Sequence, residues 1–76
     1  GLNVYPNPAT DYLNIELAQA IDQAQILDLQ GKVVQDLGQL DMGSHQFDVS
    51  GLKSGIYFVV FKNKSESFSL KLVCAR

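Results

Sequence analysis

Residue types that usually carry chemistry are scarce in this sequence, which has one cysteine, one histidine and no tryptophan. A single cysteine, Cys74, cannot form an internal disulfide, so we expect it to be a small buried apolar residue at the end of the last strand. His45 alternates with Phe47 and Val49, which indicates a strand position at a sheet margin. The acidic residues lack the spacing of a calcium loop. We therefore predict a protein that is not an enzyme, with no catalytic residue, no metal site and no cofactor.

The sequence also lacks an excess of positive charge and a long hydrophobic run. Six basic residues are scattered among eight acidic ones, for a net charge of −2, so no basic stripe is available to follow a nucleic acid. The longest apolar run, residues 56–61, is far shorter than the roughly 20 residues of a membrane-spanning helix. Nucleic acid is not an expected partner, and no membrane insertion is expected.

The length and composition predict one small folded domain over residues 1–76. Hydrophobic residues make up 46% of the chain and charged residues 18%, which is the balance of a globular domain rather than a disordered tail. A chain of this size buries only about two thirds of its unfolded surface, so its core must be simple. Because the chain opens on Gly1 and runs directly into strand-like sequence, we expect it to be the C-terminal domain excised from a larger secreted protein.

Apolar residues recur with a period of two, which is typical of strands that are buried on one face. The spacing and the turn residues between these stretches predict an all-β domain, a seven-stranded antiparallel β-sandwich. Residues 56–61 are apolar throughout, which favours a central strand covered on both faces. The expected strands are residues 2–5, 13–17, 25–29, 32–37, 45–49, 56–61 and 68–72.

The sequence predicts the form of four connections between strands. Pro6, Asn7 and Pro8 form a rigid corner that no helix can cross, because each proline fixes its own φ and restricts the residue before it. Residues 17–24 have apolar side chains at helical spacing, but the stretch is short, so we favour a strand end plus a loop over a helical turn. Residues 38–43 are expected to be a polar connection between two strands. Gly31 is expected in the tight turn of a hairpin.

Tyr57 lies just inside a late strand and is preceded by Leu52 and Gly55 in the incoming loop. This pattern suits a tyrosine corner, in which the phenol hydroxyl bonds to backbone a few residues upstream. A plain core aromatic explains the same position equally well. Both interpretations give the same fold.

A second class of function is a small β-sandwich that binds carbohydrate or protein as an accessory module of a secreted enzyme. Sugar-binding modules usually present exposed flat aromatic rings for stacking. With no tryptophan in the chain, Tyr5 and Tyr12 are the candidates for such a surface.

Three blocks of sequence together resemble the C-terminal sorting domain of the bacterial type IX secretion system, also called the Por secretion system C-terminal domain family. They are residues 4–11 (VYPNPATD), 26–34 (ILDLQGKVV) and 52–59 (LKSGIYFV). The resemblance implies an immunoglobulin-like β-sandwich that acts as a non-catalytic address at the C-terminus of a cargo protein. It implies that the cargo transits the periplasm, is exported by the outer-membrane translocon, and is secreted or anchored at the cell surface after a sortase-like cysteine protease removes the domain.

The resemblance also assigns residues. The positions that match the family pattern, each with a structural reason to be there, are Pro6, Asn7, Pro8, Asp28, Gly31, Lys32, Leu52, Gly55 and Tyr57. Lys71, Leu72 and Val73 fit the basic and β-branched ending of the family, and these residues with Arg76 are the expected recognition residues. Cys74 and Ala75 depart from that ending.

The pattern of the last strand also indicates a physical mechanism for recognition. The last strand alternates Phe68, Leu70 and Leu72, so as an edge strand it could add to the sheet edge of a receptor. Leu70→Pro should then abolish recognition, whereas Lys64→Ala should have little effect. The same edge could pair two copies of the excised domain as a homodimer.

Overall fold

The computed structural model describes residues 2–75 and shows an all-β domain in which no described residue is helical. Seven antiparallel strands form two sheets, as predicted. The strands are β1 (Leu2–Tyr5), β2 (Tyr12–Leu17), β3 (Ile21–Leu27), β4 (Val33–Leu40), β5 (Gly43–Asp48), β6 (Gly55–Asn63) and β7 (Glu66–Cys74).

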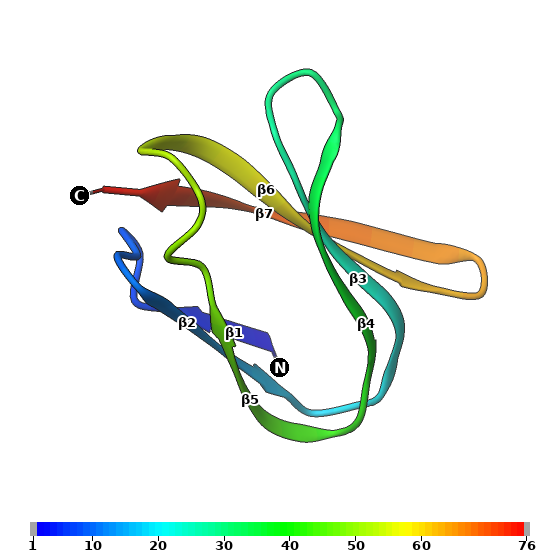
Figure 1. Cartoon of the computed structure of the whole chain (residues 1–76). Helices are drawn as coiled ribbons and strands as arrows, with labels where there is room; N and C mark the ends of the chain where they lie inside the picture. Colours follow the sequence, from blue (N-terminus) through cyan, green and yellow to red (C-terminus); the bar gives the residue numbers. More distant parts are fainter. Residues whose placement is uncertain (1, 76) are drawn as a thin grey trace.

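The two sheets pack face to face as a sandwich (Figure 1). One sheet has three strands in the order β1-β2-β5, and the other has four strands in the order β4-β3-β6-β7. The chain crosses from one sheet to the other after β2, after β4 and after β5. This order is consistent with the immunoglobulin-like arrangement that the resemblance implies.

The core lies between the sheets and is built from alternate residues of the strands. Leu13 and Ile15 of β2 face Ile26 of β3 and Val59 and Phe61 of β6, and all five are fully buried. Each of these strands is polar or less buried at the intervening positions, as the period of two predicts.

The segment at residues 17–24 is a strand end and a loop followed by a strand, so the helical alternative is wrong. β3 nevertheless begins at Ile21, four residues before the predicted start at residue 25. A shift in the β3–β4 register between Ile21 and Ala24 places both side chains in the core. The bulge therefore produces the three-residue apolar spacing that imitates a helix.

The predicted polar connection at residues 38–43 is also wrong over most of its length. β4 continues to Leu40, and Leu37 and Leu40 are both buried although they are three residues apart. Gly38, with a φ of +73°, lies between them opposite Ala24 at the irregularity. A positive φ suits glycine, because side chains disfavour this conformation.

The apolar strand β6 is central, because it pairs with β3 on one side and β7 on the other. It is not covered on both faces. Tyr57, Val59 and Phe61 point into the core, whereas Ile56 is 38% exposed and Phe58 is half-buried on the outer face. An apolar surface is thus left open on the outside of the four-stranded sheet.

Tyr57 forms a tyrosine corner, which was one of the two interpretations that the sequence allowed. Its hydroxyl donates a hydrogen bond of 2.8 Å to the carbonyl of Lys53, and the residue is only 8% exposed. Leu52 in the same connection packs half-buried against the core. The loop between β5 and β6 is thereby fixed to the start of β6.

Candidate recognition site

The Pro-Asn-Pro corner of residues 6–8 holds the end of β7. The Nδ2 group of Asn7 donates to the carbonyl of Lys71 at 3.0 Å, and the Oδ1 atom of Asn7 accepts from the amide of Val73 at 3.0 Å. The side-chain amide of Asn7 therefore bonds to the strand as a backbone peptide group of a neighbouring strand would. In Figure 1 the loop after β1 lies beside the red end of β7.

Ala9, which follows the corner, extends this pairing with its backbone. Its amide donates to the carbonyl of Val73 at 2.8 Å, and its carbonyl accepts from the amide of Ala75 at 2.9 Å. These bonds form a parallel bridge to Cys74, and Ala9 itself is fully buried. The peptide bonds before Pro6 and Pro8 are both cis.

These contacts divide the edge of β7 into two halves. Lys71, Val73 and Ala75 direct backbone groups away from β6 toward the corner, so by the alternation of a strand Ser67 and Ser69 point their backbone groups the same way. The corner covers residues 71–75, and the edge of residues 66–70 stays open. Strand addition by a partner is thus blocked over the C-terminal half of β7.

The four expected recognition residues have different surroundings. Leu72 is fully buried in the core, so its side chain supports the strand and faces no partner. Lys71 is exposed and Val73 is half-buried, and both point to the outer face because they alternate with buried Leu72 and Cys74. Arg76 lies outside the described residues.

Lys71 and Val73 belong to one surface with two residues of β6. Phe58 is the cross-strand partner of Lys71, and Ile56 is the partner of Val73. We call these four residues, Ile56, Phe58, Lys71 and Val73, the C-terminal patch. The patch is an apolar area with one cation on its border.

The matched positions at residues 28–32 build the turn between β3 and β4. The Oδ1 atom of Asp28 accepts from the amides of Gln30 and Lys32 at 2.9 and 3.0 Å, and the carbonyl of Asp28 accepts from the amide of Gly31 at 3.0 Å. Gly31 has a φ of +85°, a left-handed conformation that favours glycine. These hydrogen bonds of Asp28 all lie within the turn, which fits a structural position. At the start of β6, Gly55 pairs with Cys74.

The outer face of the three-stranded sheet carries the two tyrosines that a sugar-binding surface would use. Tyr5 is 44% exposed and Tyr12 is 52% exposed. The Tyr5 hydroxyl donates to Oε2 of Glu16 at 2.6 Å, and this hydrogen bond raises the pKa of the Tyr5 phenol. Desolvation and the negative charge of Glu16 raise this pKa further.

The cysteine and the histidine belong to different sheets. Cys74 is 1% exposed within the core, which agrees with its prediction as a small buried apolar residue. His45 lies on β5, an edge strand, where its Nε2 atom is 2.7 Å from the carbonyl of Asp41 and its ring stacks on Phe47. Across residues 2–75, no group of three His, Cys, Asp or Glu side chains is placed to hold a metal ion. No helix in the described part of the chain could cross a membrane.

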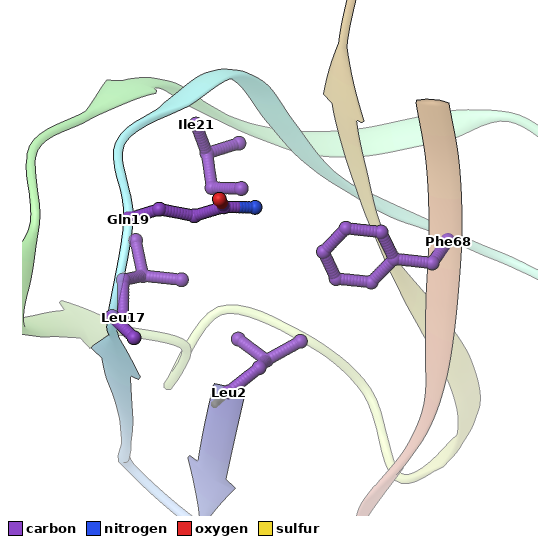
Figure 2. Close-up of a pocket in the computed structure, with 6 residues that line it drawn as sticks. Leu2, Leu17, Gln19, Ile21 and Phe68 are labelled. Atoms are coloured by element: carbon purple, nitrogen blue, oxygen red, sulfur yellow. The ribbon is translucent and has the colours of Figure 1, made fainter. Parts of the chain in front are cut away.

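One surface feature was missed by sequence reasoning. A groove of about 360 Å³ separates Phe68 of β7 from the start of β1, the end of β2 and the start of β3. Figure 2 shows the Phe68 ring facing Leu2, Leu17 and Ile21 across this groove. Phe68 alternates with polar residues along β7 and points to the inner face, yet it is 37% exposed, because the three-stranded sheet does not cover this part of β7.

Two comparisons with known proteins bear on this arrangement. Residues 3–75 match the family described as "Secretion system C-terminal sorting domain". The chain is also 38% identical over 73 residues to the protein named Beta-agarase D from Zobellia galactanivorans (strain DSM 12802 / CCUG 47099 / CIP 106680 / NCIMB 13871 / Dsij). That match covers 95% of this chain and 14% of the relative, so the chain spans about one seventh of the length of that protein.

Proposed function

The chain belongs to the secretion system C-terminal sorting domain family, and from this premise we propose that the outer-membrane translocon of the type IX secretion system recognises it through the C-terminal patch. Members of this family are C-terminal secretion signals for type IX export. The domain is thus a sorting signal rather than a catalytic unit, and it implies an upstream cargo that reaches the cell surface or the extracellular space.

The match over residues 3–75 carries the proposal, and the surroundings of the last strand support the choice of surface. An apolar centre with a charged border is the usual composition of a protein–protein contact. Ile56, Phe58 and Val73 supply the centre and Lys71 supplies the border. The cation of Lys71 favours a partner surface that is apolar and acidic.

The route and processing of the cargo complete the proposal. The cargo transits the periplasm, and the folded domain leads it to the translocon. A sortase-like cysteine protease then separates the domain from the cargo, which is released or anchored at the surface. Residues 1–76 are accordingly the sorting domain of a larger secreted protein.

The test is export of a fluorescent reporter fused to residues 1–76 in a bacterium that has this secretion system. Truncation of β7 is a poor test, because it removes Leu72 from the core. Lys71→Glu is better, since Lys71 is exposed and the change reverses the charge at the border of the patch. Lys62→Glu is the matched control, because Lys62 is an exposed lysine at the far end of the same sheet face.

We expect Lys71→Glu to lower the surface fluorescence about ten-fold, which corresponds to a loss of about 1.4 kcal/mol in binding. Lys62→Glu should be exported like the original domain. Thermal unfolding of the two purified variants must match, so that stability is excluded as the cause. Normal export of Lys71→Glu, or an equal defect in both variants, would contradict recognition through the patch. Periplasmic retention of the original folded fusion would contradict the sorting function itself.

A further inference from the structure

The open half of the β7 edge is suited to a second copy of the same domain. We propose that two free domains pair antiparallel along residues 67–69, with Phe68 of each copy on the two-fold axis. The proposal rests on the proposed function only in that the domain becomes free of its cargo.

Backbone groups of Ser67 and Ser69 provide the hydrogen bonds for this pairing. β7 is the last strand of the four-stranded sheet, and these two residues direct their N–H and C=O groups away from β6. Within residues 2–75, neither residue makes a backbone hydrogen bond on that side, whereas Lys71 and Val73 are bonded to Asn7. An edge of this kind is a template for another strand.

The open stretch also lacks the devices that usually protect an edge. β7 pairs with β6 without a register shift from Glu66 to Cys74, whereas β4, the other edge of this sheet, is interrupted by shifts. Residues 67–70 contain no proline and no charge. Regular, uncharged edges pair readily with other strands.

Two apolar side chains beside this edge remain partly exposed to solvent. Phe68 and Leu70 point to the inner side of the sheet, yet they are 37% and 36% exposed. The Phe68 ring stacks on Phe61 of its own sheet at 5.4 Å on one side and borders the groove of about 360 Å³ on the other (Figure 2). A second copy added at this edge would place its own Phe68 beside this Phe68 and so cover part of the exposed apolar surface.

The sequence of the open stretch selects a second copy as the added strand. Residues 67–69 read Ser-Phe-Ser, which is the same in both directions. In an antiparallel pair centred on Phe68, Ser67 of each copy lies opposite Ser69 of the other, and four N–H···O=C bonds form from open groups alone. A pair centred on Ser69 would instead place Ser67 against Lys71, whose carbonyl already accepts from Asn7.

The side chains agree with this register. The two Phe68 residues form a non-hydrogen-bonded pair, in which the Cβ atoms are about 4.5–5.5 Å apart and the rings can reach the groove. Glu66 of each copy lies opposite Leu70 of the other, so no like charges face each other across the pair. The contact is nevertheless small against the about 1,600 Å² of a typical stable interface, so the dissociation constant should be on the order of 0.1–1 mM.

The test is sedimentation velocity of the free domain from about 10 µM to about 1 mM, a span that brackets a weak pair. Ser69→Pro removes an outward N–H and leaves the β6–β7 ladder intact, because proline is tolerated at an edge position that faces solvent. Ser69→Ala is the matched control, since it removes the hydroxyl and keeps the N–H. We expect the original domain and Ser69→Ala to dimerise as concentration rises, and Ser69→Pro to remain monomeric with an unchanged circular dichroism spectrum.

A charge exchange tests the register and does not depend on tolerance of proline. Phe68→Lys alone and Phe68→Glu alone place like charges opposite each other on the axis and should both be monomeric. An equimolar mixture of the two should dimerise again. A monomeric original domain at about 1 mM, dimers of Ser69→Pro, or no recovery in the mixture would overturn the proposal.

The export assay separates this proposal from the proposed function. If Ser69→Pro abolishes export while the original domain stays monomeric, the open edge belongs to the translocon and the homodimer is wrong. A failure of the domain to direct export leaves the sedimentation result unaffected.

Discussion

Removal of the Asn7 side chain should destabilise the domain measurably although the residue is exposed. Asn7→Ala deletes the hydrogen bonds to the carbonyl of Lys71 and the amide of Val73. Each intramolecular hydrogen bond contributes about 1 kcal/mol net, and water can replace part of both bonds at this exposed site. We therefore expect the free energy of unfolding to fall by about 1–2 kcal/mol. For a domain of this size, that change lowers the melting temperature by about 5–15 °C.

Two further variants separate the hydrogen bonds from the general effect of losing an asparagine. Asn7→Asp keeps an acceptor for the amide of Val73 but cannot donate to the carbonyl of Lys71, so at neutral pH it should lose at least the first of the two bonds. Asn3→Ala is the matched control, because Asn3 is exposed on β1 and its side chain makes no hydrogen bond within residues 2–75. Its effect should stay within about 0.5 kcal/mol.

The assay is urea unfolding followed by circular dichroism, with amide hydrogen exchange at Val73 as a local probe. Exchange at Val73 should accelerate in Asn7→Ala, because the amide loses its acceptor. An Asn7→Ala domain as stable as the Asn3→Ala control would refute the view that the corner holds β7.

Leu72→Ala should lower stability by about 2–5 kcal/mol, because the side chain is fully buried, whereas Leu70→Ala on the same face should have a smaller effect because Leu70 is 36% exposed. Equal losses in urea unfolding would contradict this placement. Tyr5 should ionise above the ordinary value of 10.0, and Glu16→Gln should return its pKa toward that value, as measured by ultraviolet absorbance. Since the folded pKa is raised, any stabilisation from this bond is complete below pH 10 and is lost as the pH rises through the folded pKa. An unchanged titration in Glu16→Gln would show that the carboxylate is not the cause.

The strands could be predicted because the local rule is simple. Alternating Leu13 and Ile15, and the apolar run around Val59, give the correct class, strand number and central strand. The largest errors in strand bounds occurred where β3 and β4 are irregular opposite each other. A bulge changes the spacing of buried residues from two to three, so a period-two rule ends the strand too early and a helical rule fits by accident.

The contacts of the recognition site were much less predictable. The sequence shows that Asn7 lies between two prolines, but its partner strand is more than 60 residues away, and no local pattern identifies it. The exposure of Phe68 has a similar cause. The alternation of residues predicts that Phe68 points to the inner side of β7. Its exposure, however, depends on how far the three-stranded sheet extends over that side.

Recognition of the C-terminal patch is coupled to folding by the contacts of the corner. Lys71 and Val73 present their side chains outward only while two conditions hold. Leu72, the residue between them, must lie in the core, and Asn7 must bond to the backbone of β7. The residues that fix this strand come from the opposite end of the sequence, so the patch exists only when both ends of the domain have met. A partner that binds the patch therefore binds the folded domain and discriminates against an unfolded one without contacting the core. Asn7→Ala should therefore reduce export in proportion to its loss of stability, and a second stabilising substitution elsewhere should restore export.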